Sequence, residues 1–226
     1  EEDNLPAVLD ALHAELPEAD VLVIDDGSTD RTAAVAREHG ATVHSLGGNL
    51  GLRFGIAAGY RWALEHGYAY CGRVDADGQH PPRELARLLA LVRSGRCDVA
   101  VGSRFVSGEG YPPYRYLPSP ARRFGTAVLR RAMTLALGRT FGDATSGLYA
   151  VNAKALPLLA EPFTSRAPEV EALIRVTNGG LRLEEVPVTM AARASGDSKL
   201  RGSKAVKLVL TVAATLIGAK LIRSRR

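Results

Sequence analysis

Cysteine, aromatic residues and long apolar runs are all scarce in this chain of 226 residues. It has two cysteines, and aromatic side chains make up 6% of its residues. Cys71 and Cys97 lie in apolar runs, outside any Cys-x-x-Cys pair. We therefore expect buried free thiols in a reducing compartment, which excludes a disulfide scaffold. The apolar run at 208–219 is shorter than the ~20 residues of a spanning helix, which argues against a membrane span in this sequence.

The charge is weighted toward one sign and toward one half of the chain. The formal net charge is +5, and clusters of arginine and lysine occur in the second half. A basic half suits an anionic partner, either a phosphate-bearing ligand or a lipid surface. Aromatic residues are few and no known nucleic-acid-binding motif is present, so we expect no nucleic acid partner.

The apolar pattern alternates between strand-like and helix-like segments along most of the chain. Continuous apolar runs bounded by turn residues predict buried strands at 21–24, 41–45, 68–74, 97–101 and 183–190. Helical spacing predicts helices at 1–16, 30–40, 54–67, 81–92, 121–138, 168–180 and 203–226. Strands that alternate with helices in this way predict an α/β fold with a mainly parallel sheet.

A pair of aspartates follows the predicted strand at 68–74. Asp75 and Asp77 are two residues apart, so in extended backbone they share a face, and Gln79 follows at the same spacing. The carboxyl ends of strands in a parallel sheet line the ligand crevice. Two carboxylates placed there repel each other unless a cation lies near them, and Mg²⁺ or Mn²⁺ takes such oxygen ligands. A solvated Asp-x-Asp turn is the alternative.

A similar arrangement occurs earlier in the chain. Asp25 and Asp26 end the strand at 21–24 and lead through a glycine turn into a helix. They could accept hydrogen bonds from a base or a ribose, and a helix cap is the plain alternative. The glycine-rich turn at 47–55 matches neither the GxGxxG pattern nor the P-loop. Its small residues would still let the backbone approach a ligand closely.

These motifs occur in an order that resembles the family 2 glycosyltransferases of GT-A fold. The order is "DDGSTD", "NLG" and "DADGQHPP", followed by "VGSRF", "GDATSGLYAVN", "PEVEAL", "EVPV" and "RASGDSK". The likeness is greatest to the polyprenyl-phosphate sugar transferases, such as the dolichol-phosphate mannose synthases, and it covers essentially the whole chain. It implies a GT-A domain at 1–200 and a basic amphipathic helix at 201–226, which suits the membrane interface. A core helix or a dimer contact is the alternative for this segment.

The resemblance implies roles for individual residues. The donor nucleotide would be bound by Asp25, Asp26, Asn49, Gly51 and Asp75. The divalent metal, Mg²⁺ or Mn²⁺, would be held on the donor pyrophosphate by Asp75, Asp77 and Gln79. The acceptor phosphate would be received by Arg104, one of Arg122 or Arg123, Arg193, Ser198 and Lys199. Arginine suits this task because it makes bidentate contacts. The predicted catalytic residues are Asp77 and Asp143.

The activity implied by the resemblance is a metal-dependent, inverting transfer of a sugar from a GDP- or UDP-sugar to a polyprenyl phosphate. A phosphate acceptor is ionised at neutral pH and needs no strong base, whereas a sugar hydroxyl needs one, for which Asp143 is the candidate. Transfer to a hydroxyl of a glycan or small molecule and a non-catalytic scaffold are the alternatives. We expect a cytoplasmic protein, peripheral at the inner face of the membrane, acting alone or with a small integral membrane partner.

The resemblance also implies a strand at the start of the domain that the apolar pattern of this sequence does not contain. In the family, an apolar strand ending in a sequence like "PAYNEE" lies in the middle of the sheet, and only "EEDN" at 1–4 corresponds to it here. We therefore expect a sheet that lacks its first strand within these 226 residues.

Overall fold

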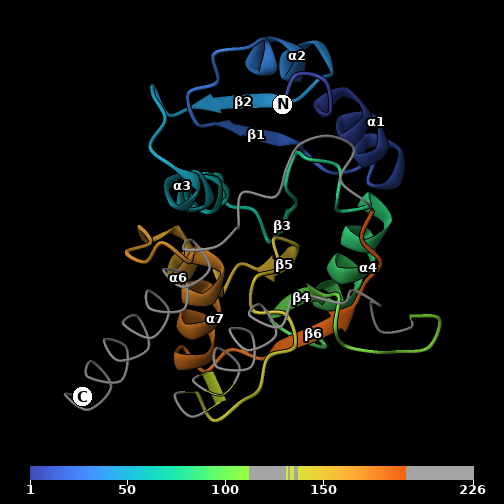
Figure 1. The fold of residues 1–226 in the computed structure, drawn as a ribbon, viewed down its shortest axis with the longest axis vertical. Helices are drawn as coiled ribbons and strands as arrows, with labels where there is room; N and C mark the ends of the chain where they lie inside the picture. Colours follow the sequence, from blue (N-terminus) through green and yellow to red (C-terminus); the bar gives the residue numbers. More distant parts are fainter. Residues whose placement is uncertain (112–130, 132, 135–136, 192–226) are drawn as a thin grey trace, which may run out of the picture.

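The computed structural model describes residues 1–111, 131, 133–134 and 137–191, and it confirms the α/β class (Figure 1). The strands are β1 (Leu22–Asp25), β2 (Thr42–Ser45), β3 (Tyr70–Arg73), β4 (Val99–Ser103), β5 (Tyr149–Asn152) and β6 (Leu183–Pro187). The helices are α1 (Leu5–Glu15), α2 (Thr32–Glu38), α3 (Leu52–Glu65), α4 (Pro82–Arg93), α6 (Leu156–Ala160) and α7 (Pro168–Asn178). The predicted helix at 203–226 and most of the one at 121–138 lie outside the described residues.

The strands form two sheets, with the order β1-β2 in one and β3-β5-β4-β6 in the other. In Figure 1 the two-stranded sheet lies above the four-stranded one, and β1 and β3 are the strands that face each other across the break. The described strands on the two sides share no hydrogen-bonded ladder. The structure thus has two separate sheets where the sequence pattern predicted one.

The four-stranded sheet is mixed rather than mainly parallel. Strand β6 runs parallel to β4, whereas β5 runs antiparallel to both of its neighbours, β3 and β4. The sequence pattern predicted neither β5 nor the short helix α6. The apolar run of β5 is so short that its periodicity does not separate a strand from part of a buried helix.

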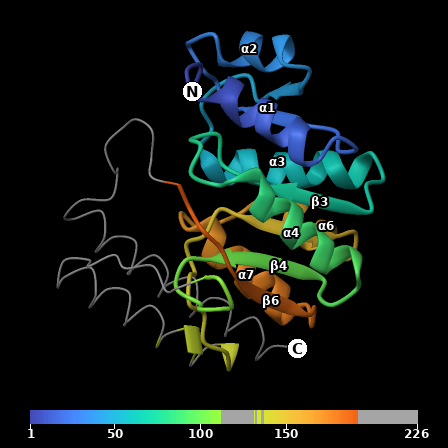
Figure 2. The same ribbon diagram turned by 90° about the vertical axis from the view of Figure 1, so that its right-hand side faces the viewer.

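Helices cover both faces of the four-stranded sheet. On β4, Val99 and Val101 join the apolar cluster formed with α3, α6 and α7, whereas Ala100 joins the cluster formed with α1 and α4. Figures 1 and 2 show these two groups of helices on opposite sides of the sheet. Because neighbouring residues of a strand point to opposite faces, a strand covered on both sides must be apolar throughout. This explains the continuous apolar run that identified β4 in the sequence.

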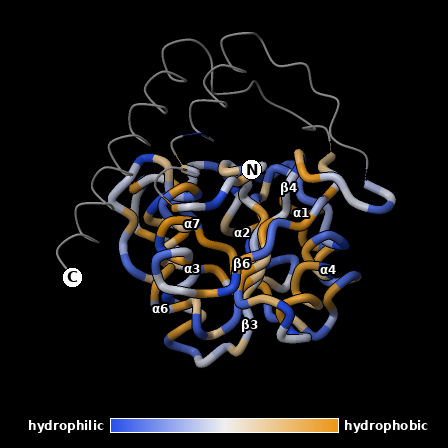
Figure 3. The backbone as a smooth tube through the Cα atoms, turned by 90° about the horizontal axis from the view of Figure 1, so that it is seen from below, coloured by the Kyte–Doolittle hydropathy of each residue, from blue (hydrophilic) through white to orange (hydrophobic). Residues whose placement is uncertain are grey.

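One buried carboxylate ties helix α4 to the segments that follow β4 and β6. Glu84 is only 2% exposed, and it accepts hydrogen bonds from the hydroxyl of Thr189 (2.6 Å), Nη2 of Arg87 (3.0 Å) and the hydroxyl of Tyr111 (3.3 Å). Burying a charge is costly unless it is paired in this way. Figure 3 shows the distribution of hydropathy along the backbone, with apolar residues along the central strands and polar residues toward the outer loops. Within the described ranges, no helix is long and apolar enough to cross a membrane.

Candidate functional site

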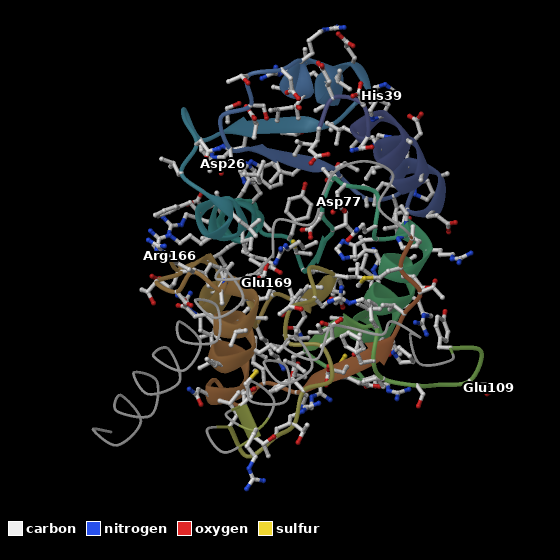
Figure 4. All side chains as sticks on the ribbon, viewed as in Figure 1. Asp26, His39, Asp77, Glu109, Arg166 and Glu169 are labelled. Atoms are coloured by element: carbon white, nitrogen blue, oxygen red, sulfur yellow. The ribbon has the colours of Figure 1, made fainter. Side chains whose placement is uncertain are left out.

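Several of the predicted site residues that the structure describes follow the end of a strand. Asp26 follows β1, Asp75 and Asp77 follow β3, and Arg104 follows β4. Figure 4 labels Asp26 and Asp77 together with Glu169, which comes from the first turn of α7. Polar side chains thus follow the ends of these strands, whereas the binding roles predicted for them stay predictions.

The carboxylate of Asp25 at the end of β1 is buried and is held by neighbouring groups. Its Oδ1 accepts a hydrogen bond from the backbone N–H of Ser28 (2.9 Å), and its Oδ2 accepts one from the hydroxyl of Ser45 (3.1 Å). Hydrogen bonding from Ser28, and to a lesser degree from Ser45, lowers the pKa of Asp25 despite its burial. Asp25 therefore joins the ends of β1 and β2 as an ionised group.

Asp26 holds the glycine-rich turn that follows β2. Its carboxylate accepts hydrogen bonds from the backbone N–H groups of Leu50 (2.6 Å) and Gly51 (2.8 Å to Oδ2). The turn lies directly on Gly27, where a Cβ would come within 2.5 Å of the backbone nitrogen of Asn49. Gly27 also has a φ of +74°, which other residues rarely adopt. Asp26 thus fixes the turn that carries Asn49 and Gly51, and the nucleotide binding predicted for these residues stays a prediction.

Removing the Asp26 carboxylate should loosen this turn. We expect the Asp26→Ala variant to exchange the amide hydrogens of Leu50 and Gly51 on the order of ten-fold faster, because hydrogen bonds to a charged acceptor are worth ~1.5–3 kcal/mol. Hydrogen exchange followed by NMR or mass spectrometry measures this directly. The matched control is Asp10→Ala, which removes an exposed carboxylate from α1 that pairs with His39. Unchanged exchange at both amides would contradict the role given to Asp26.

The environment of Asp75 is made by three segments distant in sequence. Its Oδ1 lies 3.2 Å from Nη2 of Arg73, and the same nitrogen lies 3.4 Å from Oε1 of Glu169. Its backbone N–H donates a hydrogen bond to Nδ1 of His80 (3.1 Å). The backbone of Gly147 lies so close that an added Cβ would overlap Oδ2 of Asp75. The position of this predicted metal ligand therefore depends on an ion pair, a backbone hydrogen bond and a glycine.

Asp77 and Gln79 form the turn that leads into α4. Oδ1 of Asp77 accepts a hydrogen bond from the backbone N–H of Gln79 (3.1 Å), and Gly78 between them has a φ of +73°. The backbone carbonyl of Gln79 accepts a hydrogen bond from the N–H of Ala191 (3.0 Å). The turn that carries the predicted metal ligands is thus joined to the segment that follows β6.

His80 is a buried, neutral side chain that contacts the backbone of Asp75. It is 6% exposed, and burial lowers its pKa although the nearby Asp75 carboxylate opposes this shift. Because Nδ1 accepts the Asp75 N–H, the proton of the neutral ring is on Nε2. His80 therefore fixes the backbone at the end of β3, a role that its place in "DADGQHPP" did not reveal.

Two further predicted residues, Arg104 and Asp143, are partners of each other. Nε and Nη2 of Arg104 lie 2.6 and 2.8 Å from the two carboxylate oxygens of Asp143, which forms a bidentate pair. The backbone N–H of Asp143 is in turn held by Oε1 of Glu185 at 2.9 Å. The predicted roles of Arg104 toward an acceptor phosphate and of Asp143 as a base stay predictions. The geometry adds that each of the two residues positions the other.

The remaining predicted acceptor residues lie outside the described part of the chain. They are Arg122, Arg123, Arg193, Ser198 and Lys199.

The donor set at the end of β3 fits a divalent ion that takes few protein ligands. No group of three or more histidine, cysteine or acidic residues is placed to hold a metal in the parts of the chain that are described. The aspartates Asp75 and Asp77 nevertheless supply hard oxygen atoms. Mg²⁺ in nucleotide enzymes is bound by one or two carboxylates plus phosphate and water, and Mn²⁺ prefers the same ligand types. The residues present suit an ion that is shared with a bound diphosphate.

Comparison with known proteins decides the family. Residues 1–156 match the family described as "Glycosyl transferase family 2". This chain belongs to that family. The family predicted from the order of the motifs is therefore confirmed, and the protein is a glycosyltransferase.

Two relatives of this glycosyltransferase match over most of their length. One is named polyprenol monophosphomannose synthase, from Mycolicibacterium smegmatis. It is 33% identical over 237 aligned positions, which cover 100% of this chain and 86% of the relative. The other is named undecaprenyl-phosphate mannosyltransferase, from Micrococcus luteus. It is 35% identical over 221 positions, which cover 93% of this chain and 87% of the relative.

Solved structures support the GT-A fold. A glucosyl-3-phosphoglycerate synthase from Mycobacterium tuberculosis, solved with Mn²⁺, uridine diphosphate and phosphoglyceric acid, superposes with a TM-score of 0.67. The match covers 97% of this chain and 75% of that one at 20% sequence identity. At this identity the likeness concerns the fold alone.

Three residues of the site were missed by the sequence analysis, namely Arg73, His80 and Gly147. Arg73 had a usable signal, because it lies two residues before Asp75 in a strand and so shares its face. The contacts of Gly147 join segments far apart in the chain, and no local pattern predicts them.

Proposed function

We propose that this glycosyltransferase carries out a metal-dependent, inverting transfer of mannose from a nucleoside diphosphate mannose to a polyprenyl phosphate. The observation that carries the proposal is that Asp75 and Asp77 directly follow β3, just as Asp25 ends β1 and Asp26 follows it. The names of the two long-matching relatives supply the sugar and the acceptor class. The proposal brings these two lines of support together.

The donor half of the site would bind the nucleotide at β1 and the diphosphate at β3. Asp26 would act mainly by holding the turn with Asn49 and Gly51 against the nucleotide, since both of its oxygens accept hydrogen bonds from that turn. Asp75 and Asp77 would hold the divalent ion on the diphosphate. When bound, that ion would offset the negative charge that develops on the departing nucleoside diphosphate.

The proposed transfer is a single displacement. An oxygen of the acceptor phosphate forms a bond to the anomeric carbon while the bond from that carbon to the donor's β-phosphate oxygen breaks. The electron pair leaves with the nucleoside diphosphate, and the configuration at the anomeric carbon inverts. Because the acceptor phosphate is already ionised at neutral pH, no side chain has to remove a proton. Asp143, paired with Arg104, would then position the acceptor side rather than act as a base.

The acceptor would reach this site from a membrane surface. Basic amphipathic sequences at 121–137 and 204–226 support a peripheral position at the inner face of the membrane. Arg122, Arg123, Arg193, Ser198 and Lys199 would supply further contacts to the acceptor phosphate, in addition to Arg104.

The test compares acceptors that differ by one phosphate. Purified protein is incubated with GDP- or UDP-mannose and either a short polyprenyl phosphate or the corresponding polyprenol, with Mn²⁺, Mg²⁺ or EDTA. We expect lipid-linked mannose from the polyprenyl phosphate alone, with one of the two donors, and only when a metal is present. Transfer to the polyprenol or to an added glycan would support a hydroxyl acceptor instead. Absence of both transfer and donor binding would support a non-catalytic scaffold.

A further inference from the structure

The guanidinium group of Arg73 contacts two carboxylates, those of Asp75 and Glu169. Arg73 is the last residue of β3, and its side chain is 13% exposed. One nitrogen, Nη2, contacts both Oδ1 of Asp75 (3.2 Å) and Oε1 of Glu169 (3.4 Å). Figure 4 shows the label of Glu169 near α7 and that of Asp77 closer to the two-stranded sheet. Arg73 therefore links the aspartate turn after β3 to the first turn of α7.

The surroundings of Arg73 keep it charged, and within the described residues the ion pairs of its two partners involve no second charged cation. Burial by itself lowers the pKa of Arg73, but Asp75 and Glu169 raise it, and the net direction is upward. The phenols of Tyr60 and Tyr149 are buried beside this group, and burial raises the pKa of each, so both stay neutral. The ion pairs described for Asp75 and Glu169 involve Arg73 and, for Asp75 at 4.0 Å, the neutral His80. One positive charge is thus shared by two carboxylates.

We propose that Arg73 is a positioning residue that acts as the internal counter-ion of Asp75 and sets how tightly the site holds its divalent ion. The inference rests on the proposed function, because it assumes that Asp75 helps to hold a metal. Nη2 of Arg73 lies 3.2 Å from Oδ1 of Asp75, so a metal ion bound by Asp75 would have to share that carboxylate with a guanidinium. Its positive charge also opposes a second cation nearby.

The consequence concerns product release. A nucleoside diphosphate that carries a tightly held metal leaves slowly, and a counter-ion that weakens the metal's hold on the protein favours departure of both. Glu169 helps to keep Arg73 in place, because its Oε1 accepts a hydrogen bond from the same nitrogen, Nη2. The counter-ion role therefore predicts that removing Arg73 tightens metal binding, whereas a purely structural clamp would not change metal affinity in this direction.

The test measures Mn²⁺ binding rather than activity. Free Mn²⁺ is followed by electron paramagnetic resonance while it is titrated into the protein with uridine or guanosine diphosphate present. We expect Arg73→Met to bind Mn²⁺ about ten-fold more tightly than the original protein, because a positive charge beside Asp75 no longer opposes the cation. Arg73→Lys restores a positive charge and should stay near the original affinity. Arg96→Met is the matched control, since Arg96 pairs with Glu184 elsewhere on the surface (2.6 Å).

The outcomes separate this inference from the proposed function. Equal or weaker Mn²⁺ binding by Arg73→Met, in a protein whose original form binds Mn²⁺, overturns the counter-ion role and leaves the proposed function standing. Absence of Mn²⁺ binding by the original protein overturns the counter-ion role, and the transfer assay with Mg²⁺ then tests the proposed function separately. If Arg73→Met does not fold, Arg73→Gln tests the same point, because its amide can still donate hydrogen bonds to the two carboxylates without the charge.

Discussion

Replacing Asp77 with asparagine should reduce the rate of sugar transfer on the order of 1,000-fold while leaving the protein folded. The asparagine carbonyl can still accept the hydrogen bond that Oδ1 of Asp77 takes from the N–H of Gln79, so the turn is expected to persist. What is lost is a negative oxygen ligand. Metal-assisted stabilisation of a leaving group is worth several kcal/mol, and each ~1.4 kcal/mol changes a rate about ten-fold.

The measurement is the rate of lipid-linked product at saturating donor, with the thermal unfolding temperature as a check on folding. The matched control is Asp20→Asn, an aspartate that accepts a hydrogen bond from Tyr68 away from the strand ends of the site. A folded Asp77→Asn variant that retains more than about a tenth of the original rate would contradict the role given to Asp77.

Adding one methyl group at Gly147 should reduce activity about 100-fold with little loss of stability. A Cβ at this position would overlap Oδ2 of Asp75 and would lie 2.9 Å from its Cγ and 3.0 Å from Cε1 of His80. The Asp75 carboxylate is the end of a short side chain and can turn aside, so the fold should survive. A shift of ~1 Å in a group that positions the reacting parts is enough for such a loss of rate.

The control for this variant is a glycine that has room for the methyl group. At Gly55 in α3 an added Cβ would make an ordinary contact, 3.6 Å from Cγ2 of Ile24. Gly55→Ala should keep full activity and gain about 0.5–1 kcal/mol of stability, because alanine is the better helix former. Transfer rates and thermal unfolding of the two variants are compared side by side. An active Gly147→Ala variant would mean that Asp75 does not need the position seen here.

The parts of the fold that were predictable are those in which burial leaves a local pattern. Strand β4 is covered on both faces, so its apolar run is continuous and identified it. The start of helix α4 was predictable from Pro81 and Pro82, because proline is favoured in the first turn of a helix. Strand β5 was not predicted, because its short apolar run follows an irregular segment. Its antiparallel direction depends on pairing with β3 and β4 rather than on its own residues.

The site was predictable to the same extent. Asp25, Asp26, Asp75 and Asp77 lie at or directly after the end of an apolar strand, and their position in the sequence was enough to predict this. The bidentate pairing of Arg104 with Asp143 was not predictable, since it joins loops 39 positions apart. The sequence predicts an acceptor-binding role for Arg104 and a catalytic role for Asp143, and only the contact between them suggests that they act together.

The measurement that tests the central claim most directly is the NMR analysis of the lipid product made with Mn²⁺ from a nucleoside diphosphate mannose and a polyprenyl phosphate. Coupling between ³¹P and the anomeric position reports whether the sugar is attached to the acceptor phosphate, and the anomeric carbon reports its configuration. We predict one mannose linked through the phosphate, with the configuration opposite to that of the donor. A product with retained configuration, or with the sugar on a hydroxyl group, would contradict this account.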